Sequence, residues 1–292
     1  MNSLVKVFIT TPLKASSELA AQAIRREKYN ALFLTFHKDI EYYLYDLAEG
    51  EPLETIVEKI LKKNLIAEPS AAWIYWAEPV LKALEGLFKI TPSVEILCVE
   101  ESYEHEYATT CKVDLAVLEF KGILGRVDIE QWRKLLHEYI LFSLHSSQKK
   151  VDFIAEEAKK HRESLCISFN SGSIKRLFKI LGIKVQLKYT MKPYFFLPPQ
   201  VLQRVIRKEM ICGEAVPDNV LEELIEQDID FISNYLQSSK NIDEAYEKWI
   251  KVKRPKKPLK KKRFRAVRAG TVRIYACGDR ASTERDLGKF SR

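Results

Sequence analysis

The chain has 292 residues, of which 46% are hydrophobic and 11% aromatic, a composition that supports a sizeable core and excludes a largely disordered protein. No apolar run approaches the roughly 18 residues of a membrane span, and the N-terminus is apolar for only about seven residues, which does not favour a signal peptide. The segment 251–292 has 16 Lys and Arg against three acids, a net charge of +13, so the first 250 residues carry a net charge of −5.

Strands and helices alternate along the first two thirds of the chain. Apolar and β-branched runs predict strands at 5–11, 31–36, 94–100, 164–169 and 184–189, of which the first and fourth are expected to be buried. Helical spacing of apolar residues predicts helices at 15–29, 39–64, 70–88, 128–145, 150–163, 171–181, 199–211, 217–237 and 242–250. The stretch 101–125 is left open between helix and strand.

This order predicts an α/β fold with a mostly parallel sheet flanked by helices. We expect an α/β domain over residues 1–195 and a helical C-terminal part over 196–250 packed on it. Residues 251–292 have no amphipathic period and contain two prolines, so they are expected to form a flexible, disordered basic tail.

The basic tail is the clearest functional feature of the sequence. Polyphosphate is its natural counterpart, because each neutralised phosphate releases a counterion. We therefore expect DNA or RNA to bind mainly through phosphates, although a solubility tail, a contact with an anionic membrane surface and a docking arm for an acidic protein remain open. The residues expected to contact nucleic acid are Lys253, Arg254, Lys256, Lys257, Lys260, Lys261, Lys262, Arg263, Arg265 and Arg268.

The stretch DLAVLEFKG, which begins at Asp114, contains the residue set of Mg²⁺-dependent nucleases with a D…ExK centre. In those enzymes two carboxylates share one metal ion. Asp114 and Glu119 would lie on opposite faces of a strand, or about 140° apart on a helix, which favours structural charges over a metal centre. A nuclease with Glu119, Lys121 and Asp114 as catalytic residues is kept as an alternative, with Glu100 or Glu101 able to replace Asp114. Mg²⁺ is expected only in that case.

Two hydroxyl-rich loops, TTPLKASS and NSGS, follow the first and fourth predicted strands and lead into helices. Ligands of open α/β sheets bind beyond the carboxyl ends of the strands, and helix N-termini favour anions. The loops therefore predict either a phosphate or nucleotide site or ordinary helix caps. The residues expected to bind the ligand are Thr10, Thr11, Lys14, Ser171, Ser173 and Lys175.

The five cysteines form no C-x-x-C pair, and the five histidines have no recognised metal-binding spacing. We therefore predict no metal site, no resident cofactor and mostly buried thiols in a reducing cytoplasm. The high content of Lys, Glu, Tyr and Ile with little Gln is typical of thermophile proteins.

The order of elements, with VFITTPLKASSELAAQAIRREKYNALFLTF, AEPVLKALEGLFKITPSVEILCVEE and HRESLCISFNSGSIKRLFKILGIKV, resembles the TraB and erythromycin-esterase-like superfamily over about residues 4–190. That superfamily has a His after its first strand, an acid after its second and a Gly-x-His turn after a late strand. This chain has Thr10-Thr11-Pro12, Phe36-His37-Lys38 and Asn170-Ser171-Gly172-Ser173 there. The resemblance therefore implies the fold without the catalytic residues.

The segment SFNSGSIK is also similar to the Gly-Thr-Lys turn of CARF domains, which sense cyclic oligoadenylates in type III CRISPR defence. That resemblance implies that TTPLKASS is a second ligand loop. The usual HEPN ribonuclease partner has an Arg-x(4–6)-His motif, but no His follows His161 here.

We expect a non-catalytic protein that binds nucleic acid, or acts as an accessory protein, through its basic C-terminal tail. The alternatives are the Mg²⁺-dependent nuclease and a nucleotide- or anion-sensing domain of the CARF kind. The sequence leaves open DNA versus RNA, any enzymatic activity, and a homodimer.

Overall fold

The computed structural model describes residues 3–66, 70–168 and 182–253, which all fall in one compact unit of residues 1–253. Five parallel strands form its sheet, in the spatial order β3-β2-β4-β1-β5. The expected α/β architecture with a parallel sheet is therefore confirmed. The strands are β1 (Leu4–Ile9), β2 (Ala31–His37), β3 (Glu95–Glu100), β4 (Glu163–Ser168) and β5 (Lys184–Tyr189).

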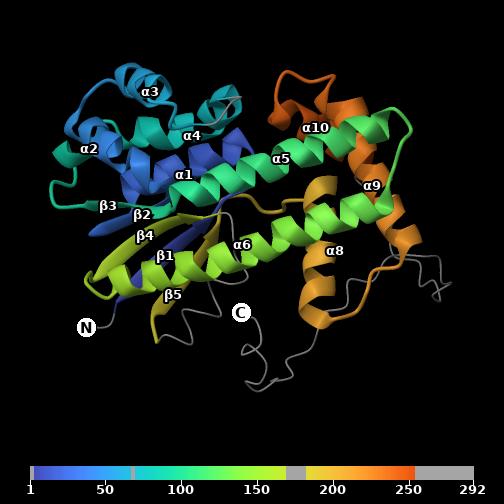
Figure 1. The fold of residues 1–292 in the computed structure, drawn as a ribbon. Coiled ribbons are helices and arrows are strands. Elements are labelled where there is room, and N and C mark those ends of the chain that lie inside the picture. The colour runs from blue at the N-terminus through green and yellow to red at the C-terminus, as the bar shows by residue number, and fades with distance from the viewer. Residues whose placement is uncertain (1–2, 67–69, 169–181, 254–292) are drawn as a thin grey trace, which may run out of the picture. The chain divides into compact units, whose positions relative to one another are not determined.

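Four helices cover one face of the sheet (Figure 1). Their apolar side chains pack on Leu32 and Leu34 of β2, Cys98 of β3 and Leu165 of β4. These helices, with the short η1 (Lys38–Ile40) and η2 (Leu87–Lys89), are α1 (Lys14–Arg26), α2 (Glu41–Glu49), α3 (Leu53–Lys62) and α4 (Ser70–Leu84).

The opposite face of the sheet is covered by the C-terminal half of α6 (Ile129–Ala158). Val151, Ile154 and Ala155 of this helix pack on alternate residues of β1 and on Phe33 of β2. β2, β3 and β4 are buried along most of their length because helices cover both faces of the sheet there, whereas the edge strand β5 is at most partly buried. Figure 1 shows α6 and its antiparallel neighbour α5 (Ser102–Ile123) extending beyond the sheet on the side of the C-terminal helices.

The C-terminal helices pack on the C-terminal half of α5 and the N-terminal half of α6. They are α8 (Pro198–Cys212), α9 (Asp218–Phe231), the π-helical turn η3 (Ile232–Leu236) and α10 (Ile242–Lys253). One core joins α8 and α9 to α6 around Trp132. A second core joins α10 to Leu13, the residue before α1, and to Leu197, the residue before α8.

The observed elements differ from the prediction in three regions. Residues 102–123, within the stretch for which the sequence does not decide between helix and strand, form the helix α5. The helices expected at 128–145 and 150–163 form the single helix α6, because no Gly or Pro interrupts residues 129–158. The helix expected at 39–64 is divided, because Gly50 ends α2 with a φ of 118° and Pro52 precedes α3.

In the described ranges, no helix combines the length and apolarity that crossing a membrane requires. The helix expected at 171–181 and the basic tail beyond Lys253 lie outside those ranges.

Candidate nucleic-acid interface

The loop that follows β1 is held by contacts within the chain. Thr10 donates from its backbone N–H to the carbonyl oxygen of Ser168 at 2.8 Å and from Oγ1 to the same oxygen at 3.2 Å. The backbone N–H of Thr11 donates to Oγ of Ser16 at 2.8 Å, and that hydroxyl also contacts the hydroxyl of Thr190. Both Thr10 and Thr11 are buried, and the hydroxyl of Thr11 donates to Sδ of Met191 at 3.6 Å, so both hydroxyls serve contacts within the chain.

The N-terminus of α1 is occupied by a carboxylate of the chain itself. Asp243 of α10 accepts hydrogen bonds from the backbone N–H of Lys14 at 2.9 Å and of Ala15 at 3.2 Å. Lys14 pairs with Glu78 through its ammonium group, which also lies 5.0 Å from the ring centre of Tyr75. The described half of the expected anion site is therefore filled by internal partners. Its other half, with Ser171, Ser173 and Lys175, lies outside the described residues.

The three residues of the D…ExK motif lie on α5. Asp114 and Lys121 are both exposed on its outer surface, whereas Glu119 is half-buried on the other side of the helix. Helical geometry separates Asp114 from Glu119 by about 140°, so the helix does not bring these two carboxylates together. Among the described residues, no group of three or more His, Cys, Asp or Glu has an arrangement that could hold a metal ion.

Glu119 instead faces an acid that the sequence did not reveal. Asp228 of α9 is 1% exposed, and its Oδ1 has no hydrogen-bond partner. Burial, with the charge of Glu119 as a second cause, raises the pKa of Asp228 to about 8, and burial also raises the pKa of Glu119. Asp228 therefore carries a proton at neutral pH. The available signal was its position: an acid at helical spacing from the core residues Leu221 and Ile225.

The glycine of the same motif has a packing role. A Cβ on Gly122 would lie 2.3 Å from Cδ1 and 2.9 Å from Cγ1 of Ile229, so its absence permits the close approach of α9 to α5. The motif DLAVLEFKG is thus accounted for as a helix segment that packs on α9 through Leu115, Leu118 and Gly122.

A small cavity of about 250 Å³ lies at the carboxyl ends of β2 and β3. β2 continues into α2 on one face of the sheet and β3 into α5 on the other, which makes this a topological switch point. Its charged groups are mostly paired with one another: Lys38 with Glu101, and Lys150 with Glu100 at 2.8 Å and Glu104 at 3.5 Å. This pairing leaves little charge for an anionic ligand.

The connector between β5 and α8 combines exposed aromatic rings with cations. Nζ of Lys192 lies 4.1 Å from the ring centre of Tyr189, and the guanidinium carbon of Arg204 lies 4.0 Å from that of Phe196. Tyr189, Phe195 and Phe196 are all exposed. Exposed rings beside cations are the side chains on which proteins stack the bases of single-stranded nucleic acid. We refer to Tyr189, Lys192, Phe195, Phe196 and Arg204 as the cation–aromatic surface.

The connector is fixed to α10, the helix from which the basic tail begins. The Tyr194 ring stacks on Tyr246 with their centres 5.4 Å apart, and Tyr246 Oη accepts a hydrogen bond from the backbone N–H of Phe195 at 3.1 Å. Lys253, the last residue of α10, lies seven positions after Tyr246, which corresponds to about 10 Å along the helix axis. The described chain therefore ends near the connector. Of the predicted nucleic-acid contacts, only Lys253 is described, and it is exposed.

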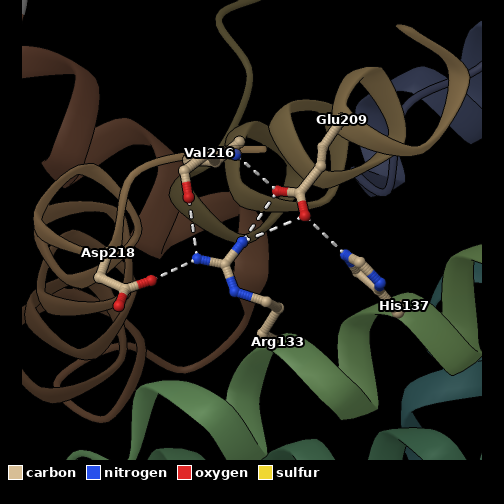
Figure 2. A network of polar contacts seen from close by, with 5 residues as sticks. All are labelled: Arg133, His137, Glu209, Val216 and Asp218. Carbon is tan, nitrogen blue, oxygen red and sulfur yellow. Dashed lines mark hydrogen bonds and ion pairs between the residues drawn. The ribbon is translucent and has the colours of Figure 1, made fainter. Parts of the chain in front are cut away.

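A polar network fixes α8, which carries Arg204, against α6 (Figure 2). Arg133 donates to the buried carboxylate of Glu209 at 2.9 and 3.1 Å, to the carbonyl oxygen of Val216 at 2.8 Å and to Asp218 at 2.6 Å. His137 Nε2 lies 3.0 Å from Oε1 of the same carboxylate, an oxygen that Arg133 also contacts. The network joins α6, α8 and the start of α9. It therefore fixes the position of α8, the helix that follows Phe196 in the chain.

Comparison of the chain with protein-family models, with curated proteins and with solved structures gave no match in any of the three.

Proposed function

We propose that the protein binds DNA or RNA through phosphate contacts of residues 251–292 and catalyses no reaction on the nucleic acid. The observation that carries this proposal is the separation of charge along the chain, −5 over residues 1–250 and +13 over residues 251–292. Such a segment attracts polyphosphate without reading bases, because ion pairing to phosphates carries no sequence information.

The cation–aromatic surface supports a preference for single strands. Rings that lie beside Lys192 and Arg204 offer stacking faces to unpaired bases, whereas the bases of a duplex are already stacked on one another. The surface belongs to the connector that contacts α10 through Tyr194, Phe195 and Tyr246. We include a cytoplasmic location in the proposal, which the buried thiols of Cys98, Cys111 and Cys166 support.

The test compares the full chain with a variant in which Lys260, Lys261, Lys262 and Arg263 are changed to Gln. Affinity for single-stranded and duplex DNA and RNA oligonucleotides is measured by fluorescence anisotropy between about 50 and about 200 mM salt. If all four cations contact phosphates of a single strand, the slope of log K against log salt falls by about three in magnitude. A matched control changes four exposed lysines of the body to Gln, Lys62, Lys63, Lys89 and Lys159, and should leave the slope unchanged.

Equal salt slopes for the tail variant, the control and the unchanged chain would contradict the proposal, as would the absence of binding at low salt. The same oligonucleotides incubated with Mg²⁺ test the non-catalytic part. Cleavage that requires Mg²⁺ and is lost in Glu119→Gln would overturn that part and favour the nuclease alternative.

A further inference from the structure

Helix α5 is apolar on two opposite sides. One side, with Cys111, Leu115 and Leu118, is buried against the neighbouring helices. The other side leaves four large apolar side chains in contact with solvent. Their exposed fractions are 55% for Val113, 48% for Val117, 61% for Phe120 and 59% for Leu124, the residue that follows the helix.

The four side chains form one continuous stripe. Their spacing of four, three and four residues is that of the core positions of a coiled coil, which places them in a row along one face of the helix. Contiguous apolar patches of this kind on a water-exposed face mark interaction surfaces. The outer face of α5 therefore has the residue pattern of a helix that packs against a second helix.

Two opposite charges lie along the same edge of the stripe. Asp114 directly follows Val113 and Lys121 directly follows Phe120, so both occupy the same heptad position on the helix. Seven residues correspond to two turns and about 10 Å of helix. Among the described residues, neither side chain takes part in an ion pair, and both are exposed.

We propose that α5 pairs in antiparallel orientation with α5 of a second copy of this chain, about a two-fold axis between Val117 and Phe120. In this orientation each edge of the stripe faces the same edge of the other helix. Asp114 of each copy then faces Lys121 of the other, and the axis repeats the pair. Val117 lies opposite Phe120 of the second copy, and Val113 opposite Leu124.

The charge pattern selects this occupant and this orientation. Reversal of the helix direction exchanges the positions of Asp114 and Lys121, so the edge is complementary to itself. A parallel pair would place this edge against the other edge of the stripe, where Ala116 and Ile123 offer neither charge a partner. The basic tail is a poor occupant, because residues 251–273 contain 12 Lys and Arg, no acid and few large apolar side chains.

The test is a charge exchange on the full, nuclease-treated protein, with the dimer dissociation constant measured by sedimentation equilibrium. Asp114→Lys and Lys121→Asp each place like charges opposite one another and should weaken the dimer about ten-fold or more. The double variant restores opposite charges and should return the constant to within about three-fold of the unchanged protein. Val117→Glu should weaken the dimer further, and Lys112→Asp, an exposed control away from that edge, should not.

Far-ultraviolet circular dichroism and the melting temperature of each variant verify that the fold is kept, which the exposure of all the altered side chains favours. A protein that stays monomeric up to about 100 μM would overturn the proposal. A dimer that is insensitive to Val117→Glu would also overturn it, because the interface would then lie elsewhere. If the double variant dimerises no more tightly than Asp114→Lys or Lys121→Asp alone, the antiparallel pairing is refuted.

Discussion

The carboxylate of Asp243 caps the N-terminus of α1 at Lys14, across 229 residues of chain. Asp243 belongs to the first turn of α10, and its Oδ2 also accepts a hydrogen bond from Tyr75 of α4 at 3.1 Å. One side chain thus fixes the helix that ends at Lys253 to the first helix of the α/β layer. The position at which the basic tail leaves the described structure depends on this contact.

Asp243→Ala should lower the free energy of unfolding by about 1–2 kcal/mol, because the first N–H groups of α1 lose an anionic hydrogen-bond acceptor. Asp243→Asn should cost less, since the amide oxygen still accepts a hydrogen bond. Urea denaturation measures both. Glu247→Gln, an exposed substitution on the same helix, is the control. An unfolding free energy that is equally changed in Asp243→Ala and the control would show that the cap contributes nothing.

Asp228 should make stability depend on pH. Its pKa is about 8 in the folded protein and about 3.9 in an unfolded chain, so between those values the folded state binds the additional proton. The contribution is therefore fully present below about pH 4, is lost as pH rises toward 8, and is constant above that.

Asp228→Asn removes this titration. The unfolding free energy of Asp228→Asn relative to the unchanged protein should rise by about 1 kcal/mol per pH unit between pH 5 and 7. Urea denaturation of both proteins at each pH measures the difference, which cancels titrating groups that they share. A difference that does not vary with pH would be inconsistent with a buried, protonated Asp228.

Removal of Arg133 should leave the carboxylate of Glu209 buried without its main partner. We expect Arg133→Ala to lower the unfolding free energy by about 2–3 kcal/mol, toward the lower end for buried pairs because the Arg133 side chain is partly exposed. Arg126→Ala, at an exposed position just after α5, is the control. If the two substitutions have equal effects, the network of Figure 2 does not stabilise the protein.

Phe196→Ala should weaken binding of single-stranded oligonucleotides by about 1–3 kcal/mol if a base stacks on this ring. Phe196→Tyr should retain the affinity, because it keeps the aromatic face. Duplex binding should change little, since its bases are not free to stack. Tyr42→Ala, an exposed aromatic residue on α2, is the control. If Phe196→Ala and the unchanged chain have equal affinity in anisotropy titrations, the Phe196 ring does not contact the nucleic acid.

Local pattern was sufficient for the layers of this fold. The five strands and the helices between them follow from apolar runs and helical spacing, because a strand covered on both faces, such as β2, is apolar along most of its length. The apolar pattern does not show whether residues 101–125 form a helix or a strand. A helix that is apolar on two sides, as α5 is, lacks the one-sided period by which a surface helix is recognised.

The sequence by itself determined the alternation of strands and helices and the separation of charge along the chain. Only the tertiary structure decided the strand order, the capping of α1 by Asp243 and the burial of Asp228 beside Glu119. Secondary structure and charge follow from neighbours in the chain, which a sequence displays directly. Strand pairing, helix capping and pKa shifts here join residues far apart in the chain, and no local period records which of them meet.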